Sequence, residues 1–373
     1  MTITRERGKG VHETGRLKAA FCERRPGSFY QNAAGCIPVE HQPDQTRQQK
    51  GTAMSSRQSS IPPGSQAIPP QQMPPDVSRW GEHPSTYVVQ DRTNGAELAR
   101  LALQDTMITA AMGGVLPDQT DPASLRRLLD VGCGTGGWLI EIAKAYPTIK
   151  LLVGVDISKR MVEYARTQAE AQEVSDRVEF HMMDALRMLE FPPRFFDLVN
   201  QRLGNSYLRS WDWPKLLQEY QRVTRPGGIM RITESEMSVE SSSPTLTLLF
   251  EVALAALAQA GHFFTPQSRG VTGDLARLLH QHGLQQVQTK SYALEYRAGT
   301  PEGDLFVEDM QHLFRTLLPF LHKWTRVPDD YEALYQQMLQ EIHQPDFVAK
   351  GNMLTAWGRV LGSIDQPESD RPS

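Results

Sequence analysis

The central part of the chain alternates between two hydrophobic periods. Short stretches that are apolar throughout, or at every second position, are typical of buried strands, and they fall at 128–131, 150–156, 178–182, 195–200 and 229–233. Between them, apolar residues recur three and four positions apart, the spacing of helices with one buried face. A helix with the same spacing is expected at 95–112. Strands that alternate with helices predict an α/β fold with a parallel sheet covered on both faces.

Two longer helical segments follow the fifth predicted strand, at 237–283 and 302–345. In the first, Leu246–Ala260 is apolar on nearly all faces, which predicts a helix buried in a core. This stretch is shorter than the ~20 residues that a bilayer requires. The second segment is expected to pack as a cap. Strands are predicted at 288–296 and 353–360.

Residues 1–79 show neither period. Six of the fifteen residues from Ile61 to Pro75 are proline, which lacks the backbone donor that helices and sheets need. We therefore predict a disordered tail at 1–79 and one folded domain at 80–365. A peptide ligand for a partner, or a later start at Met54 or Met73, is the alternative interpretation of this tail.

Composition narrows the function classes. Residues 1–75 hold ten Lys and Arg against five Asp and Glu, whereas the remainder holds 29 against 38. An acidic main body is a poor electrostatic partner for nucleic acid. The mean hydropathy of −0.43 and the absence of an apolar N-terminal segment argue against membrane insertion or export. Three cysteines without metal-ligand spacing predict a reducing, cytoplasmic setting and no metal site.

The chemistry is concentrated where the first three predicted strands end. The first ends in Asp130 and a glycine-rich turn, the second in Asp156, and the third in Asp184. Ligands bind at the carboxyl ends of open α/β sheets. Glycine lets the backbone approach a ligand closely, and one carboxylate can accept both hydroxyl protons of a ribose while another accepts from an adenine amine. These positions predict an adenosine-shaped site.

The glycines do not identify the cofactor. Gly132, Gly134 and Gly137 fit the dinucleotide fingerprint, and Gly136 fits an alternative spacing equally well. Asp130 is more informative, because an anion there would oppose a pyrophosphate but could hold the amino group of an amino acid. Cys133 is interpreted as a small loop residue rather than a nucleophile, and Asp197 as structural.

Several ordered motifs resemble the class I S-adenosylmethionine-dependent methyltransferases of the small-molecule type. They are LLDVGCGTG (128–136), GVDIS (154–158), MMDA (182–185), FDLVNQR (196–202) and RPGG (225–228). The resemblance implies a Rossmann-like, doubly wound, seven-stranded and mostly parallel sheet. Its last strand would run antiparallel between the fifth and sixth strands, and the helical insertions would form a cap.

The resemblance also implies roles for individual residues toward S-adenosylmethionine. Near its methionine part we expect Asp130, Gly132 and Gly134; near the ribose and adenine we expect Asp156, Ile157, Met161, Asp184 and Ala185. Gly136 and Asn200 are also expected to bind the cofactor.

The implied reaction is in-line transfer of a methyl group to a small organic acceptor, with no nucleic-acid or membrane partner. Asn200 to Arg202 are not followed by the Pro-Pro-aromatic pattern of amino-methyltransferases that act on DNA or glutamine. Catalytic residues remain unassigned, and the candidates by location are Tyr207, Glu234, Glu236, His262 and His280. An NAD(P)-dependent oxidoreductase and a non-catalytic binding subunit are the rival interpretations.

Overall fold

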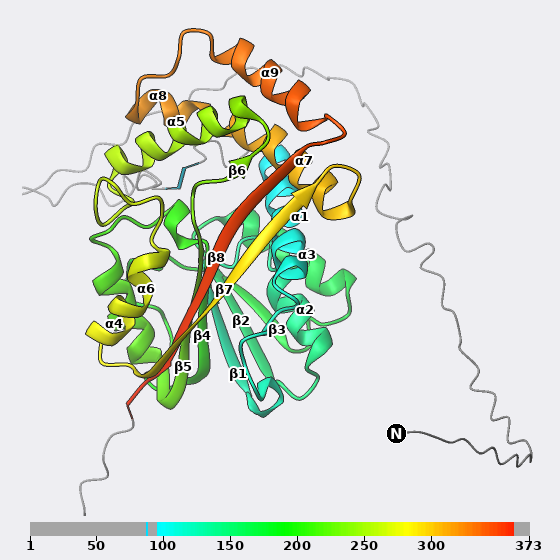
Figure 1. Cartoon of the computed structure of the whole chain (residues 1–373). Helices are drawn as coiled ribbons and strands as arrows, with labels where there is room; N and C mark the ends of the chain where they lie inside the picture. The colour runs from blue at the N-terminus through cyan, green and yellow to red at the C-terminus, as the bar shows by residue number, and fades with distance from the viewer. Residues whose placement is uncertain (1–86, 89–94, 362–373) are drawn as a thin grey trace, which may run out of the picture. The chain divides into compact units, whose positions relative to one another are not determined.

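The computed structural model describes residues 87–88 and 95–361 and has an eight-stranded sheet through its centre (Figure 1). Five strands run parallel in the spatial order β3-β2-β1-β4-β5. They are β1 (Arg127–Val131), β2 (Leu151–Asp156), β3 (Val178–Met182), β4 (Phe196–Arg202) and β5 (Thr224–Ser235). The order reverses beside β1, so the ends of β1 and β4 form the crevice in which α/β sheets bind ligands.

Antiparallel strands complete the sheet. β8 (Val348–Arg359) lies between β5 and β7 (Gln285–Arg297), antiparallel to both. The prediction that the last strand is inserted beside the fifth is therefore confirmed. A two-residue strand, β6 (Glu240–Ser241), also pairs with β8 and raises the number of strands from the expected seven to eight.

Helices cover both faces of the parallel strands. Because side chains alternate along a strand, Leu128 packs on one face of the sheet and Leu129 on the other. The first face is covered by α2 (Gly137–Ala145) and α3 (Lys159–Ala171), and the second by α4 (Trp213–Val223) and α6 (Thr272–Gln281).

The turn at 225–228 has the predicted backbone conformation at Gly227, but it lies inside the fifth strand rather than before it. Gly227 has a φ of +72°, as the third residue of a type II turn requires. The turn lies inside β5, which already pairs with β4 through Thr224, so the strand begins earlier than expected. Asp197, on β4, accepts hydrogen bonds from the backbone N–H groups of Arg126 and Arg127, both at 2.7 Å, and so links β4 to the start of β1. Its structural role agrees with the sequence interpretation.

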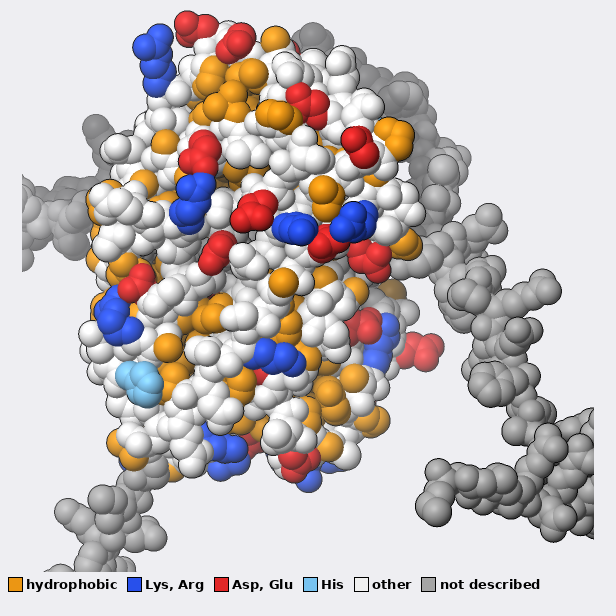
Figure 2. Space-filling model, viewed as in Figure 1, with side chains coloured by type: hydrophobic (Ala, Val, Ile, Leu, Met, Phe, Trp, Pro, Cys, Tyr) orange, Lys and Arg blue, Asp and Glu red, His pale blue; other side chains and the backbone are white. Residues whose placement is uncertain are grey.

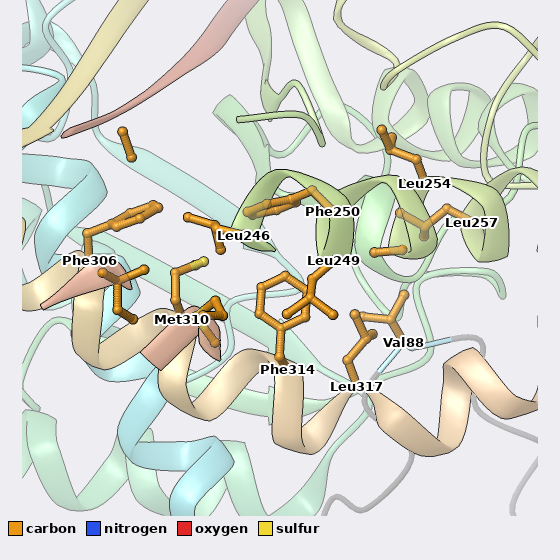
Figure 3. Close-up of a cluster of buried hydrophobic side chains, with 14 of the residues drawn as sticks. Val88, Leu246, Leu249, Phe250, Leu254, Leu257, Phe306, Met310, Phe314 and Leu317 are labelled. Atoms are coloured by element: carbon orange, nitrogen blue, oxygen red, sulfur yellow. The ribbon is translucent and has the colours of Figure 1, made fainter. Parts of the chain in front are cut away.

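A separate helical layer forms a cap above one end of the sheet (Figure 1). It contains α1 (Gly95–Ala111), α5 (Pro244–Ala260), α7 (Pro301–Thr316), α8 (Leu318–Trp324) and α9 (Tyr331–Ile342). The layer agrees with the predicted insertions except that α6, within 237–283, packs on the sheet instead and α1 joins the cap. Leu246, Leu249 and Phe250 of α5 pack against Met310 and Phe314 of α7 (Figure 3). Helix α5 also contacts α8 and α9, which explains why its sequence is apolar on nearly every face. No helix in the described ranges is long and apolar enough to span a membrane.

Candidate functional site

A cavity of about 630 Å³ extends from the carboxyl ends of the parallel strands into the cap. We call its two parts the sheet end and the cap end. The sheet end is lined by side chains and backbone from the turns after β1, β2 and β3, within 130–135, 155–161 and 183–187. The cap end is lined mainly by α1, α5, α7 and β7. Its volume falls within the ~300–1,000 Å³ typical of small-molecule sites.

The sheet end brings the three predicted carboxylates together, since Asp130, Asp156 and Asp184 all line it. Asp156 organises the loops on either side. Its Oδ2 accepts a hydrogen bond from the backbone N–H of Gly134 at 3.0 Å, and its Oδ1 accepts one from Ser158 at 2.8 Å. Ser158 in turn caps α3 by accepting the N–H of Met161 at 3.4 Å. The Asp156 carboxylate therefore links the glycine-rich turn to the start of the next helix.

Two glycines of the first turn differ in what they face. Gly134 has a φ of +53°, and a Cβ built on it would meet no atom within 4 Å, so this backbone borders open space. A Cβ on Gly132 would lie 2.5 Å from the hydroxyl of Tyr207, and the backbone there has a φ of +71°. Both positions require glycine for conformation, and the space beside Gly134 is available to a ligand.

Asp130 is the most buried of the three carboxylates, with 3% of its surface exposed. Its Oδ1 accepts a hydrogen bond from Asn200 Nδ2 at 2.7 Å, and Arg231 Nη1 donates to Asn200 Oδ1, also at 2.7 Å. Arg231 is itself paired with Asp118 at 2.7 Å, with both side chains fully buried. Burial raises the pKa of Asp130 to about 7, although Arg202 and the Asn200 hydrogen bond oppose the rise. Because this pKa is about 7, a cation that binds beside Asp130 favours the ionised form of its carboxyl group.

Most of the predicted cofactor residues line the cavity, but two do not. Gly136 lies behind the wall, where a Cβ would come within 2.5 Å of the ring of Phe180. Asn200 is completely buried beneath Asp130 and reaches the cavity only through that carboxyl group. Both residues therefore support the wall rather than form it. The residues that do line it are Asp130, Gly132, Gly134, Asp156, Ile157, Met161, Asp184 and Ala185.

The five candidates for catalysis also divide into residues that line the cavity and residues that do not. Tyr207 and Glu236 line the cavity, whereas Glu234, His262 and His280 do not. His280 is exposed on α6. His262 is buried with its Nδ1 at 2.8 Å from the carbonyl oxygen of Asn205, and burial lowers its pKa.

Glu234 has a supporting role that its sequence position did not reveal. Its carboxylate accepts hydrogen bonds from the backbone N–H groups of Gly204 and Asn205, at 2.8 and 3.1 Å, and from Gln201 Nε2 at 3.0 Å. Burial raises its pKa to about 8. These bonds hold the turn that follows Leu203, a residue with a strained φ of +56° that lines the cavity.

Two features of the cavity had no signal in the sequence. The hydroxyl group of Tyr207 is buried and has no hydrogen-bond partner among the described residues. In the cap end, Arg100 on α1 is paired with Glu97 at 2.8 Å and with Asp309 on α7 at 2.9 Å. Residues 100 and 309 are too far apart in the chain for any local pattern to connect them. Cys133 lies on the wall with a thiol pKa raised by burial, which disfavours a nucleophilic thiolate.

Comparisons with known proteins agree on one type of domain. Residues 128–228 match the family model described as a methyltransferase domain. The chain is 28% identical to 27-O-demethylrifamycin SV methyltransferase of Amycolatopsis mediterranei over 268 residues, which cover 72% of this chain and 82% of that protein. It is 30% identical to demethylmenaquinone methyltransferase of Deinococcus radiodurans over 164 residues, which cover 44% of this chain and about half, 54%, of that protein.

Solved structures show only a distant likeness. The crystal structure of geranyl diphosphate C-methyltransferase from Streptomyces coelicolor superposes with a TM-score of 0.40 and 13% identity. The match covers 73% of this chain and 85% of that one.

Proposed function

Because this chain belongs to the class I S-adenosylmethionine-dependent methyltransferases, we propose that it transfers a methyl group from S-adenosylmethionine to a small-molecule acceptor. The observation that carries the proposal is the convergence of Asp130, Asp156 and Asp184 on one cavity, beside the open backbone of Gly134. Three carboxylates in one crevice suit a ligand that is cationic and rich in hydroxyl and amine donors, and they oppose a pyrophosphate.

Each residue of the sheet end has a role toward this cofactor in the proposal. Asp156 accepts the ribose hydroxyls, and Asp184 accepts the adenine amine beside Ala185. Ile157, which is 44% exposed, and Met161 provide apolar surface for the adenine ring. Such surfaces and convergent polar groups are the usual composition of a nucleoside site.

The methionine part of the cofactor is assigned to the first turn. The carboxylate of Asp130 holds the ammonium group, and the backbone of Gly132 and Gly134 lies alongside. The hydroxyl group of Tyr207 is buried without a hydrogen-bond partner among the described residues, which costs free energy. A ligand that accepts a hydrogen bond from it would remove this cost. The hydroxyl group lies against Gly132 and donates to the cofactor in this assignment.

When bound, the cofactor supplies a methyl group on a sulfonium, whose thioether leaves without charge. The chain therefore has no departing anion to stabilise. Its work is to exclude water and to hold the acceptor atom in line, ~3–3.5 Å from the methyl carbon. The continuous cavity lets the sheet end and the cap end face each other without an intervening wall.

Binding of the methyl donor is the primary test. We expect titration calorimetry to show micromolar affinity for S-adenosylmethionine and S-adenosylhomocysteine, equivalent to about −8 kcal/mol. NAD should bind at least about a hundredfold more weakly, because Asp130 opposes its pyrophosphate. A preference for NAD would support the oxidoreductase instead. Donor binding without methyl transfer to a broad acceptor panel would support a non-catalytic binding subunit.

The variant Tyr207→Phe tests the assignment of the methionine part. Removing a hydroxyl that has no partner in the free protein should leave the thermal unfolding temperature unchanged or slightly raised. Affinity for S-adenosylhomocysteine should fall about two- to tenfold, the value of one neutral hydrogen bond. Equal affinity in the variant and the parent protein would contradict this contact.

A cytoplasmic location without a nucleic-acid partner is part of the proposal. Acidic and basic side chains are interspersed on the face in Figure 2. Exposed ion pairs include Arg297–Glu295 within β7 and Lys350–Glu295 between β8 and β7. Binding to nucleic acid requires a cluster of unpaired Lys and Arg. The acidic balance of residues 76–373 points the same way.

A further inference from the structure

The cap end is an apolar chamber. Phe250 from α5, Leu294 and Tyr296 from β7, and Phe306, Met310 and Leu313 from α7 contribute to its wall. Several of these side chains lie between α5 and α7 in the close-up of the cap core (Figure 3). Apolar and aromatic walls with few polar groups stabilise a ligand chiefly through burial, at about 25 cal/mol per Å² of apolar surface. A largely apolar molecule suits such walls.

Arg100 and Arg202 of this chamber are already paired with carboxylates. Arg100 donates from Nε and Nη2 to Glu97, at 2.8 and 2.9 Å, and from Nη1 to Asp309 at 2.9 Å. Arg202 is paired with Asp105, and both line the cavity where α1 meets the end of β4. A phosphate or carboxylate on a ligand would have to break these buried pairs, which costs more than it returns. An anionic acceptor is therefore disfavoured.

Asp309 is the polar group of the chamber with unused bonding capacity. Its Oδ1 accepts from Arg100, but its Oδ2 accepts only a long 3.4 Å bond from Gln104 Nε2. An ionised carboxylate has about four acceptor positions, and this one is 1% exposed and lies on the cavity wall. The guanidinium of Arg100 donates to both Glu97 and Asp309. These two carboxylates share one cation, so a further hydrogen-bond donor would stabilise them.

A hydroxyl group fits this position better than an ammonium group does. Burial raises the pKa of the Asp309 carboxyl group above its usual value, although the charge and hydrogen bond of Arg100 oppose the rise. A hydroxyl can donate to the carboxylate or accept from the carboxylic acid, whereas an ammonium can only donate. A neutral ligand also avoids the desolvation cost of a charged one in an apolar chamber.

We propose that the cap end binds the methyl acceptor, that this acceptor is a neutral and largely apolar molecule, and that one of its hydroxyl groups bonds to Asp309. This inference rests on the proposed methyl transfer and specifies its substrate class. Asp309 is a specificity-determining residue in this arrangement.

Three matched probes test the chemistry of the chamber. 2-Methylnaphthalene, 2-naphthol and 2-naphthyl phosphate share one apolar ring system and differ in a methyl, a hydroxyl and a phosphate group. Their binding to the full chain saturated with S-adenosylhomocysteine can be followed by their fluorescence. We expect 2-naphthol to bind about fivefold more tightly than 2-methylnaphthalene and at least about tenfold more tightly than the phosphate.

Two kinds of variant locate the probes. In Asp309→Asn, the preference for 2-naphthol over 2-methylnaphthalene should fall to less than about twofold. A structural effect of this substitution would change both affinities together and leave their ratio intact. Leu313→Trp fills the chamber and should weaken both neutral probes at least about fivefold. The matched control is Leu305→Trp, on the same helix and also partly buried but away from the cavity, where affinity should not change.

The outcomes separate this inference from the proposed function. Absence of S-adenosylhomocysteine binding in calorimetry would contradict the proposed function. Normal binding of S-adenosylhomocysteine together with tighter binding of the phosphate, or no binding of either neutral probe, would overturn the inference alone. The relative affinities of the three probes for the parent protein test the inference even if Asp309→Asn does not fold.

Discussion

Replacing Asp156 with alanine should weaken the binding of S-adenosylhomocysteine about 5- to 150-fold, a loss of ~1–3 kcal/mol. The carboxylate has two tasks in this structure. It accepts the N–H groups of Gly134 and Ser158, and in the proposed site it also accepts the ribose hydroxyls. Alanine removes the charged hydrogen bonds to the ligand and also releases the glycine-rich turn, so both effects weaken binding.

The variant Asp156→Asn separates these effects. Its carbonyl oxygen can still accept one of the two backbone N–H groups, but the charge is lost, so we expect a smaller decrease of about 3- to 30-fold. Titration calorimetry measures all affinities. The control is Asp176→Ala, because Asp176 is 72% exposed and pairs only loosely, at 3.7 Å, with its neighbour Arg177. A folded Asp156→Ala protein with unchanged affinity would show that the ribose contact is misassigned.

The residues at the sheet end of the cavity were predictable because the sequence signals for them are local. A buried strand is recognisable from its apolar period, and parallel strands must end at the same edge of a sheet. Asp130, Asp156 and Asp184 each follow such a strand, so their convergence on one cavity required no knowledge of the packing. The same reasoning explains why the inserted last strand and the buried helix α5 (Pro244–Ala260) agree with the sequence.

Sequence position does not encode the depth of a residue within the cavity wall, as Asn200 and Gly136 illustrate. Asn200 is the register partner of Asp130 on the neighbouring strand, so both belong to the same crevice. Asn200 nevertheless lies underneath, because its amide bridges Asp130 to Arg231. Gly136 follows the open Gly134 by only two residues, but the chain has by then turned inward against Phe180.

The cap end could not be predicted because its contacts are long-range. Arg100 and Asp309 are joined only when α1 and α7 pack together. In the sequence, Asp309 is one acidic residue of a helix that also carries Glu302, Asp304 and Glu308. The helical period places Asp309 on the apolar face of α7, three residues after Phe306 and four before Leu313, and it is buried whereas the other three are exposed. The period does not reveal that Arg100 is its partner. The acceptor contact that we propose for Asp309 therefore depends on tertiary packing rather than on a sequence motif.

Cofactor binding should also depend on pH through Asp130. Burial raises the pKa of this carboxyl group to about 7 in the free protein. An ammonium group bound against it stabilises the ionised form, so binding below pH 7 must expel a proton. The affinity for S-adenosylhomocysteine should therefore rise about tenfold per pH unit up to pH 7 and then level off. The α-amino group of the ligand stays mostly protonated up to pH 7, since the usual pKa of an α-amino group is about 7.7–8.0.

Calorimetry between pH 5.5 and 7.5, in two buffers with different ionisation enthalpies, measures both the affinity and the number of protons released. The diagnostic variant is Asp130→Asn, whose carbonyl oxygen can still accept the hydrogen bond from Asn200. This variant should bind more weakly at pH 7.5 and show no dependence on pH across the interval. Other groups near Asp130, namely Arg202, Asp105 and Arg231, are present in both proteins and provide an internal reference. If the variant keeps the pH dependence of the parent protein, one of these neighbours or the ligand is titrating, and Asp130 is not the residue that receives the ammonium group.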